Sequence, residues 1–186
     1  MREIIEAVKP FDSRDFIIMA QDEARFGRIS GAKKSWAPCS IRPLVPKQIV
    51  RKFTYAYSAV CPSMGEITSL ILPYANTQMM NMFLEHVSEE FKNYNIIMLL
   101  DQAGWHRANS LLIPENIKLI KQPSHSPELN PVEHVWDEIR EKHFHNKALR
   151  SLDEVEDLLC YGLKKLKNNR DSVKSLTNFP YLNLTL

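Results

Sequence analysis

Residues 96–100 read IIMLL, and Asp101 follows them directly. A continuous run of large apolar residues is typical of a central strand that is covered on both faces. A second apolar run, FIIMAQ at residues 16–21, is followed by Asp22. The sequence therefore predicts two buried strands, and each of them ends at an aspartate.

The segments around these two runs predict a mixed sheet. Residues 51–60 (RKFTYAYSAV) alternate and are rich in aromatic and β-branched side chains, which favours a strand. Glu66–Leu72 (EITSLIL) predicts another strand after a turn at residues 62–65, and residues 117–120 predict a short one. Because antiparallel strands come first and βα units follow, we expect an α/β fold in which helices flank a mixed sheet.

Helices are expected at four places: residues 76–92, residues 105–113, residues 131–139, and from about residue 151 onward. Asn76 can cap the first of them. Asn130 can cap the third, which has Pro131 at its first position and follows a proline-punctuated loop. Ser151 or Asp153 begins the last helix, which has leucines along one side.

The length and composition fit one domain that spans residues 1–186 and has a real core, since 44% of the residues are hydrophobic. No apolar run reaches the 18 or so residues that span a bilayer, and the charged first ten residues are unlike a secretory signal. Cys39, Cys61 and Cys160 show neither a disulfide framework nor a zinc pattern. We therefore expect a reducing, intracellular setting and no zinc site.

The distribution of charge is more informative than the net charge of +2. No Asp or Glu occurs between residues 24 and 65. That stretch holds eight cations: Arg25, Arg28, Lys33, Lys34, Arg42, Lys47, Arg51 and Lys52. Such a segment is typical of a surface that binds a polyanion such as DNA. On charge alone, a solvated basic face without a partner is an equal alternative.

Three carboxylates stand where the chain leaves its expected elements: Asp22, Asp101 and, in the first turn of the third helix, Glu133. In open α/β sheets, sites gather outside the carboxyl ends of the strands. Carboxylate oxygens are the ligands that Mg²⁺ and Mn²⁺ prefer, and two such ions can promote attack on a phosphodiester. The pattern indicates a metal-dependent site for phosphoryl transfer.

Each acid also has an ordinary structural interpretation. An aspartate at a strand end is often a turn residue, and Glu133 can simply complement the dipole of its helix. Glu23 could replace Asp22 as the ligand. Strand alternation directs these two side chains to opposite faces, so only one of them points at the site.

Three local sequences strengthen the catalytic interpretation. QDEARFGR (residues 21–28), LLDQAGWH (residues 99–106) and SPELNPVEHVW (residues 126–136) resemble the three acidic motifs of bacterial insertion-sequence transposases of the mariner superfamily, which are DDE-type endonucleases. The third motif is the most specific. The resemblance runs from about residue 15 to residue 149 and implies a ribonuclease H-like fold.

The resemblance also implies a chemistry. It makes Asp22, Asp101 and Glu133 the catalytic ligands of two Mg²⁺ or Mn²⁺ ions. The implied reactions are hydrolysis at transposon ends and attack of the freed 3′-hydroxyl on target DNA. His106 and Asn130, with Glu23, are the expected neighbours of this site. His106 could instead be a helix-surface or capping residue, and we slightly favour that interpretation.

Two features depart from the family pattern. Only 31 residues separate Asp101 from Glu133, fewer than is usual, and about 15 residues precede the first strand. Related transposases carry an N-terminal helix-turn-helix region there. We therefore expect a separate reading frame, a frameshift product or a trimmed chain. The expected partners are DNA (transposon ends and target), a second copy of the chain, and a separately encoded helix-turn-helix portion. The expected location is the bacterial cytoplasm, at the nucleoid.

Other interpretations stay open at this point. The chain could be a remnant that binds DNA or dimerises without catalysis, or another ribonuclease H-like nuclease that acts on RNA–DNA hybrids or junctions. Trp105 and Trp136 are expected in the core. Trp36 could stack on a base or a sugar, although packing within a hairpin is favoured.

Overall fold

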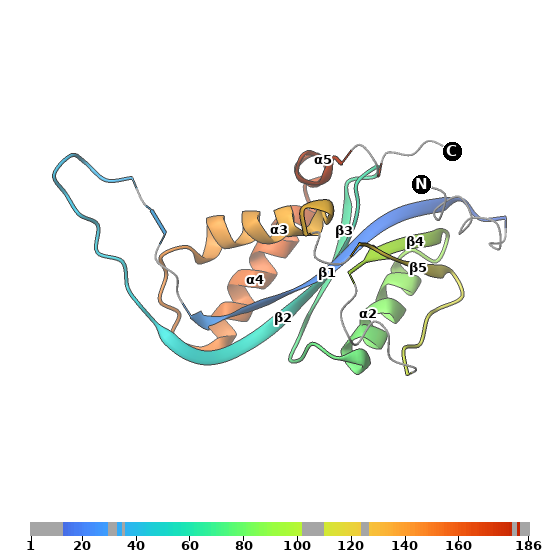
Figure 1. The fold of residues 1–186 in the computed structure, drawn as a ribbon, viewed down its shortest axis with the longest axis horizontal. Coiled ribbons are helices and arrows are strands. Elements are labelled where there is room, and N and C mark those ends of the chain that lie inside the picture. Colours follow the sequence, from blue (N-terminus) through green and yellow to red (C-terminus); the bar gives the residue numbers. More distant parts are fainter. Residues whose placement is uncertain are drawn as a thin grey trace.

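Five strands form one mixed sheet in the computed structural model, which describes residues 13–29, 33–34, 36–101, 110–123, 127–179 and 182. The strands are β1 (Phe16–Ile29), β2 (Ile49–Cys61), β3 (Glu66–Leu72), β4 (Asn95–Leu100) and β5 (Ile117–Lys121). Their order is β3-β2-β1-β4-β5, so β1 is central (Figure 1). β1 pairs antiparallel with β2 and parallel with β4. The expected mixed α/β sheet is confirmed.

Helices cover both faces of this sheet (Figure 1). They are α2 (Thr77–Glu90), a 3₁₀ turn η2 (Pro127–Leu129), α3 (Val132–Ile139), a π-helical turn η3 (Arg140–Phe144), α4 (Leu152–Lys167) and α5 (Arg170–Thr177). Asn76 Oδ1 accepts from Met79 N at 2.9 Å, and Ser151 Oγ accepts from Glu154 N at 3.0 Å. Both expected N-caps are therefore confirmed. None of the helices in the described residues is long and apolar enough to cross a membrane.

Strand alternation divides the buried residues into two cores. Ile17 and Met19 of β1 pack with the apolar side of α2 on one face. Ile18 and Ala20 pack with α3 and α4 on the other face, around the fully buried Trp136. Because a strand directs successive side chains to opposite faces, each residue of β1 belongs to one core or the other.

β1 is much longer than the apolar run that predicts it. It continues through Asp22 to Ile29, so the expectation that Asp22 ends the strand is wrong. β4 pairs with β1 only as far as Ala20, whereas β2 pairs with β1 beyond Asp22 and as far as Ile29. The antiparallel partner supplies the backbone hydrogen bonds that keep this polar segment extended.

Two other expectations about helices need comment. The helix expected at residues 105–113 lies mostly outside the described residues, and no helix is found at residues 110–113. α4 is not the last helix, because α5 follows it and buries Val173 and Thr177. Asn169 caps α5, since its Oδ1 accepts from Ser172 N at 3.0 Å.

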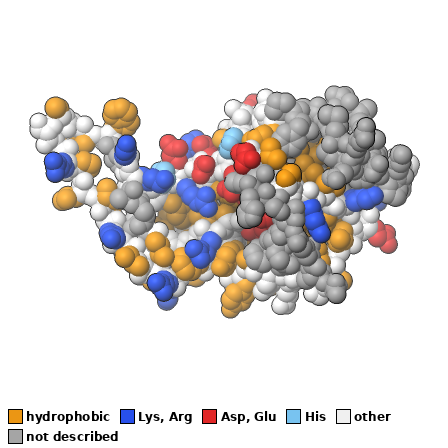
Figure 2. All heavy atoms as spheres, viewed as in Figure 1, with side chains coloured by type: hydrophobic (Ala, Val, Ile, Leu, Met, Phe, Trp, Pro, Cys, Tyr) orange, Lys and Arg blue, Asp and Glu red, His pale blue; other side chains and the backbone are white. Residues whose placement is uncertain are grey.

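The connection between β1 and β2 projects from the rest of the molecule (Figure 1). We call this connection the arm, and the structure describes its residues 33, 34 and 36–48. Lys and Arg side chains gather on the arm and around its base (Figure 2). Trp36 and Leu44 are wholly exposed, at 105% and 99%. The favoured packing role of Trp36 within a hairpin is therefore wrong.

Candidate active site

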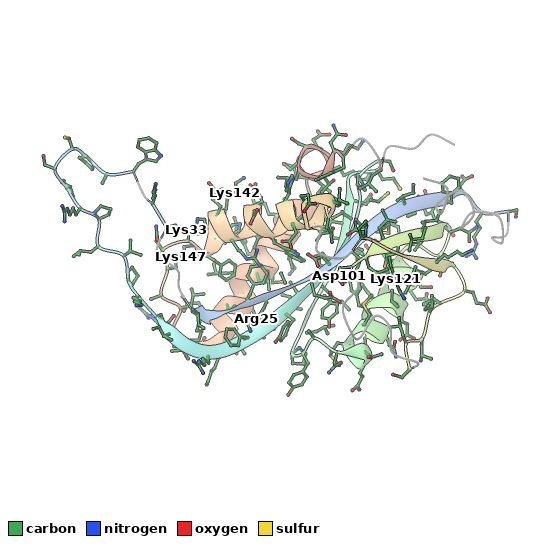
Figure 3. The ribbon with its side chains drawn as sticks, in the orientation of Figure 1. Arg25, Lys33, Asp101, Lys121, Lys142 and Lys147 are labelled. Atoms are coloured by element: carbon green, nitrogen blue, oxygen red, sulfur yellow. The ribbon has the colours of Figure 1, made fainter. Side chains whose placement is uncertain are left out.

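Asp22 and Asp101 lie on adjacent parallel strands. The parallel pairing of β1 with β4 ends at Ala20 and Leu99, and each aspartate follows two residues after its member of that pair. The two aspartates are therefore level with one another at the carboxyl end of the parallel strands. Asp101 is exposed and lies beside the middle of β1, near Lys121 (Figure 3). The expected adjacency of the two strands, with β1 central, is confirmed.

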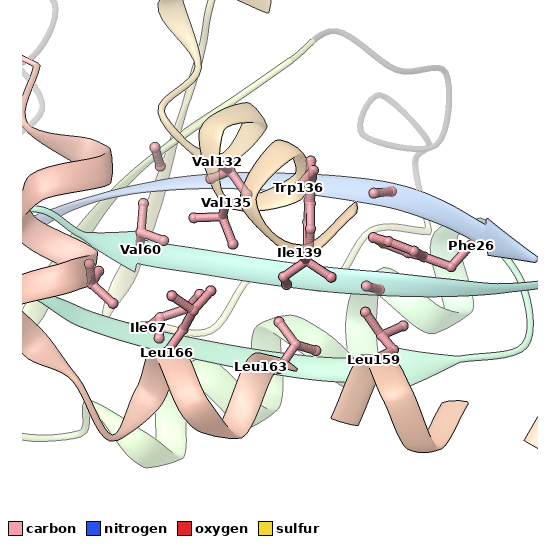
Figure 4. Packing of buried hydrophobic residues seen from close by; sticks show 14 of the residues in the cluster. Phe26, Val60, Ile67, Val132, Val135, Trp136, Ile139, Leu159, Leu163 and Leu166 are labelled. Carbon is pink, nitrogen blue, oxygen red and sulfur yellow. The ribbon is translucent and has the colours of Figure 1, made fainter. Parts of the chain in front are cut away.

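Asp22 points to the face of the sheet that α3 covers. Its Oδ2 accepts a hydrogen bond of 3.0 Å from the indole Nε1 of Trp136, which packs against the sheet (Figure 4). The pKa of Asp22 is raised from 3.8 to about 7, mainly by burial and then by the charges of Glu133 and Glu23, while hydrogen bonds from Trp136 and from the backbone of Glu23 act in the opposite direction. The surroundings of Asp22 therefore disfavour its charged form. Acids with such shifted pKa values are concentrated at functional sites.

Glu133 lies in the first turn of α3, as expected. Asn130 organises this turn: its carbonyl accepts from Glu133 N at 3.1 Å and its Oδ1 accepts from Val132 N at 3.1 Å. The amide Nδ2 of the same side chain donates to the backbone oxygen of Gln21 at 3.0 Å. Asn130 thus joins the start of α3 to β1, one residue before Asp22.

Glu23 lies on the opposite face of β1 from Asp22. The pKa of Tyr57, a residue of the core beneath α2, is raised by burial and then by Glu23. Trp136, which contacts Asp22, belongs to the other core. The expected opposition of the two acids is therefore present, and Asp22 is the one that shares a face with α3.

The structure brings the three acids to one region without gathering them into a finished metal cage. Within the described ranges, no three His, Cys, Asp or Glu side chains are close enough to hold a metal ion. Glu133 is near enough to Asp22 to raise its pKa. His106 lies outside the described residues.

The eight cations predicted to bind DNA divide into three groups. Lys34, Arg42, Lys47, Arg51 and Lys52 are exposed on the arm and on β2. Arg28 has a structural contact, because its Nε donates to the backbone oxygen of Leu149 at 2.9 Å. Arg25 and Lys33 line a cavity at the base of the arm.

Sequence reasoning placed Trp136 in the core and missed its contact with Asp22. Because a buried indole N–H usually has a hydrogen-bond acceptor, the expected burial of Trp136 could have predicted a polar partner for it. The sequence does not say which acceptor, because Asp22 is 114 residues away.

Residues 18–156, about three quarters of the chain, match the family described as DDE superfamily endonuclease. The chain belongs to this family. The resemblance to DDE-type endonucleases that the three motifs indicate is therefore confirmed at the level of the family.

Relatives agree with this membership. The chain is 35% identical over 128 residues to the uncharacterized protein y4pE/y4sA of Sinorhizobium fredii (strain NBRC 101917 / NGR234). The aligned residues make up 67% of this chain and 93% of that protein. Among solved structures it resembles the Mos1 strand transfer complex (TM-score 0.60, 17% identity) and the Mos1 transposase paired-end complex with left transposon end (TM-score 0.61, 18% identity).

The Mos1 similarity covers 95% of this chain in both complexes, and 59% and 60% of the respective Mos1 chains. This chain therefore spans about three fifths of their length. The match confirms the expected ribonuclease H-like fold, a mixed five-stranded sheet flanked by helices.

Proposed function

We propose that this chain catalyses metal-dependent cleavage of DNA at transposon ends and transfer of the 3′-hydroxyl end into target DNA, with Asp22, Asp101 and Glu133 as the ligands of two Mg²⁺ or Mn²⁺ ions. The observation that carries the proposal is the position of Asp22, level with Asp101 at the carboxyl end of β1 and β4. Asp22 is also within electrostatic reach of Glu133.

The donor set fits a hard divalent ion. All three side chains offer carboxylate oxygens, which suit Mg²⁺ and Mn²⁺. The raised pKa of Asp22 reflects burial and the repulsion of neighbouring acids, and a bound cation would relieve that repulsion. When bound, the ions would activate the attacking oxygen and stabilise the leaving oxygen of a phosphodiester.

The other residues of the site have supporting roles in this proposal. Trp136 holds one carboxylate oxygen of Asp22 in place, so the carboxylate would be oriented before the cation binds. Asn130 fixes the start of α3, and with it Glu133, against β1. The exposed cations of the arm would hold the DNA backbone, and such contacts provide affinity without reading the sequence.

Solved relatives support the choice of metal and substrate. The Mos1 mariner paired end complex was solved with Mn, and its TM-score against this chain is 0.59 at 17% identity. Because that similarity concerns the fold, metal and DNA binding by this chain are proposals. A homodimer and a separately encoded helix-turn-helix portion are further expectations of the same proposal.

The test is cleavage of plasmid DNA by the purified chain in Mn²⁺ or Mg²⁺ and in chelator. Asp101→Asn and Glu133→Gln should each reduce cleavage by about a hundredfold or more, because each removes a charged ligand at nearly constant volume. Asp137→Asn is the matched control, since Asp137 is exposed on the same helix one turn after Glu133.

The control should cleave as the wild type does. Equal metal-dependent cleavage by Asp101→Asn and the wild type would contradict the catalytic assignment. Faster cleavage of an RNA–DNA hybrid than of duplex DNA would favour another ribonuclease H-like nuclease. DNA binding without cleavage in any metal would favour a catalytically incompetent remnant.

A further inference from the structure

A cavity of about 190 Å³ opens at the base of the arm. Four cationic side chains line it, namely Arg25, Lys33, Arg140 and Lys147, and none of its lining residues in the described part of the chain is Asp or Glu. Arg25, Lys33 and Lys147 surround the region where β1, the arm and the segment after α3 meet (Figure 3). A cavity with this lining favours an anion.

Two side-chain amides, of Asn146 and Gln48, hold together the segments that line this cavity. Asn146 Oδ1 accepts from Lys33 N at 2.9 Å, and its Nδ2 donates to Lys33 O at 3.2 Å. Gln48 makes the same pair of hydrogen bonds with Leu149: its Oε1 accepts from Leu149 N at 3.0 Å, and its Nε2 donates to Leu149 O at 2.8 Å. These hydrogen bonds attach both ends of the arm to residues 146–149. The shape of the cavity is therefore fixed by specific hydrogen bonds.

The two arginines of the cavity are positioned by aromatic rings. The guanidinium of Arg25 lies 4.4 Å from the centroid of Phe53, and that of Arg140 lies 5.3 Å from the centroid of Phe26. Arg140 also lies 3.9 Å from Asp137, whose side chain is 78% exposed. A pair at that distance with so exposed a partner is weak, so the ring stacking orients the charge without cancelling it.

We propose that this cavity binds one phosphodiester of the DNA strand whose cleavage takes place at Asp22. The inference rests on the proposed function and adds Arg140 and Lys147 to the residues that contact DNA. The ligand class follows from the chemistry: guanidinium and ammonium groups with no competing carboxylate recognise a phosphate, and they do so without reading a base.

The position of the cavity predicts which phosphate it holds. Phe26 lines the cavity and lies on the same strand face as Asp22, four residues further along β1. At about 3.3 Å per residue this separation is about 13 Å. Because phosphates repeat along each DNA strand, the bound phosphate lies a few nucleotides from the cleaved bond.

Binding of a fluorescein-labelled DNA duplex in chelator, measured by anisotropy over a range of salt concentrations, tests the site without catalysis. Lys147→Gln and the double variant Arg140→Gln/Lys147→Gln should each lower the slope of log affinity against log salt by about 0.9, the value for one phosphate. The matched control, Lys142→Gln/Lys165→Gln, changes two nearby cations that line a different cavity. It should leave the slope unchanged.

Unchanged affinity in both cavity variants would overturn the proposal. A salt slope that falls further in the double variant than in Lys147→Gln would also overturn it, because each cation would then act separately on a diffuse basic surface. Inorganic phosphate that competes as strongly as the duplex would also overturn it, because the site would then take a free anion. Lys147 is exposed, so its variant keeps the test valid if the double variant fails to fold.

A scan with single neutral methylphosphonate linkages locates the contact. One linkage within a few nucleotides of the cleaved bond should weaken binding by the wild type and have no effect on the double variant. Loss at no single position would overturn the proposal. If the wild type cleaves DNA while the cavity variants bind normally, this inference fails and the proposed function stands. Absence of DNA binding by the wild type would overturn both.

Discussion

The indole Nε1 of Trp136 donates a hydrogen bond of 3.0 Å to Oδ2 of Asp22. The Trp136 side chain is fully buried, and its ring meets the Phe26 ring edge-on at a centroid distance of 6.0 Å. One side chain therefore contributes both to the core between α3 and the sheet and to the placement of a candidate metal ligand. The stability of this face and the geometry of the site are coupled through it.

Replacing Trp136 with Phe should separate these two contributions. Phe retains most of the apolar contact but cannot donate to Asp22, so the ionised form of Asp22 loses its hydrogen bond. We expect the Mn²⁺ concentration for half-maximal DNA cleavage to rise about tenfold, the typical effect of one hydrogen bond to a charged group. The measurement is cleavage rate against Mn²⁺ concentration.

Ile139→Val is the control for the lost volume, because Ile139 is an apolar side chain buried in the same helix and has no group that could donate a hydrogen bond to Asp22. It should lower the melting temperature and leave the Mn²⁺ requirement unchanged. If both variants shift the requirement equally, the hydrogen bond has no separate role.

The raised pKa of Asp22 predicts how the stability of the metal-free chain depends on pH. The folded chain holds this proton up to about pH 7, whereas the unfolded chain releases it near 3.8. Between these values the folded state binds more protons, so the free energy of unfolding falls as pH rises from about 4 to about 7. The loss is on the order of 2 kcal/mol once solvent screening is allowed for.

Thermal unfolding in chelator at a series of pH values checks this. Asp22→Asn keeps an acceptor for Trp136 but carries no charge, so it should lack this contribution and melt higher than the wild type at pH 8. Mn²⁺ should raise the melting temperature of the wild type more than that of the variant. Parallel pH profiles of the two proteins in chelator would show that Asp22 is ionised in the folded chain at acidic pH.

The parts of the fold that the sequence predicts are those whose signal is local. The apolar run of β4 and the cap at Asn76 each specify their element within a few residues. β1 was expected to stop at the first polar residue, because its continuation to Ile29 depends on pairing with β2, a partner distant in the sequence. α5 was missed because only Val173 and Thr177 of it are buried, which is too few to make a periodic pattern.

The site divides in the same way. The positions of the three acids follow from strand ends and a helix start, all of which are local patterns. The contact of Trp136 with Asp22 and the cationic cavity near Arg140 depend on segments more than 100 residues apart in the sequence. A single sequence carries no signal for such a distant pairing.

A second polar network joins the two helical layers around the edge strand β3. The Thr68 hydroxyl donates to Glu90 of α2, and Lys167 of α4 lies 2.7 Å from the same carboxylate. Burial alone would raise the pKa of Glu90, but Lys167 and Thr68 outweigh it, so the pKa lies below its ordinary value of 4.5. A depressed pKa stabilises the fold above 4.5, and this stability is lost as pH falls through the folded pKa.

Glu90→Gln should therefore lower the free energy of unfolding by about 1–3 kcal/mol at pH 7. The difference from the wild type should shrink as pH falls through the folded pKa of Glu90, which lies below 4.5, because Glu90 is then neutral in both states. Urea unfolding at pH 7 and at a series of pH values below 4.5 gives both values. A difference that is the same at the two pH values would show that the network acts through packing and not through charge.

The arm should contribute to DNA affinity without contributing to stability. Lys34, Arg42 and Lys47 are exposed on it, so replacing all three by Gln should leave the melting temperature unchanged and lower the salt slope of DNA binding by about 2–3. The same loss should occur with unrelated duplex sequences. The matched triple variant of Lys164, Lys165 and Lys174, which are exposed on α4 and α5, should bind as the wild type does. Equal effects of the two triple variants would mean that the arm is a solvated basic face.

Asn130 makes the most specific prediction about the site, because its side chain has two separate tasks. Its Oδ1 caps α3 at Val132 N, and its Nδ2 holds the backbone oxygen of Gln21. Ser can still cap the helix but is too short to reach β1, so Asn130→Ser should leave a buried carbonyl unpaired, at a cost of about 1–3 kcal/mol.

Glu133 would then no longer be held at a fixed distance from Asp22, and we expect Asn130→Ser to weaken Mn²⁺ binding, measured by electron paramagnetic resonance, about tenfold. Asn76→Ser is the matched control, since Asn76 caps α2 through the same side-chain atom and lies far from the site in the sequence. It should lower stability slightly and leave Mn²⁺ binding intact. Wild-type Mn²⁺ affinity in Asn130→Ser, with the expected loss of stability, would show that the link from α3 to β1 holds the fold and has no part in placing Glu133.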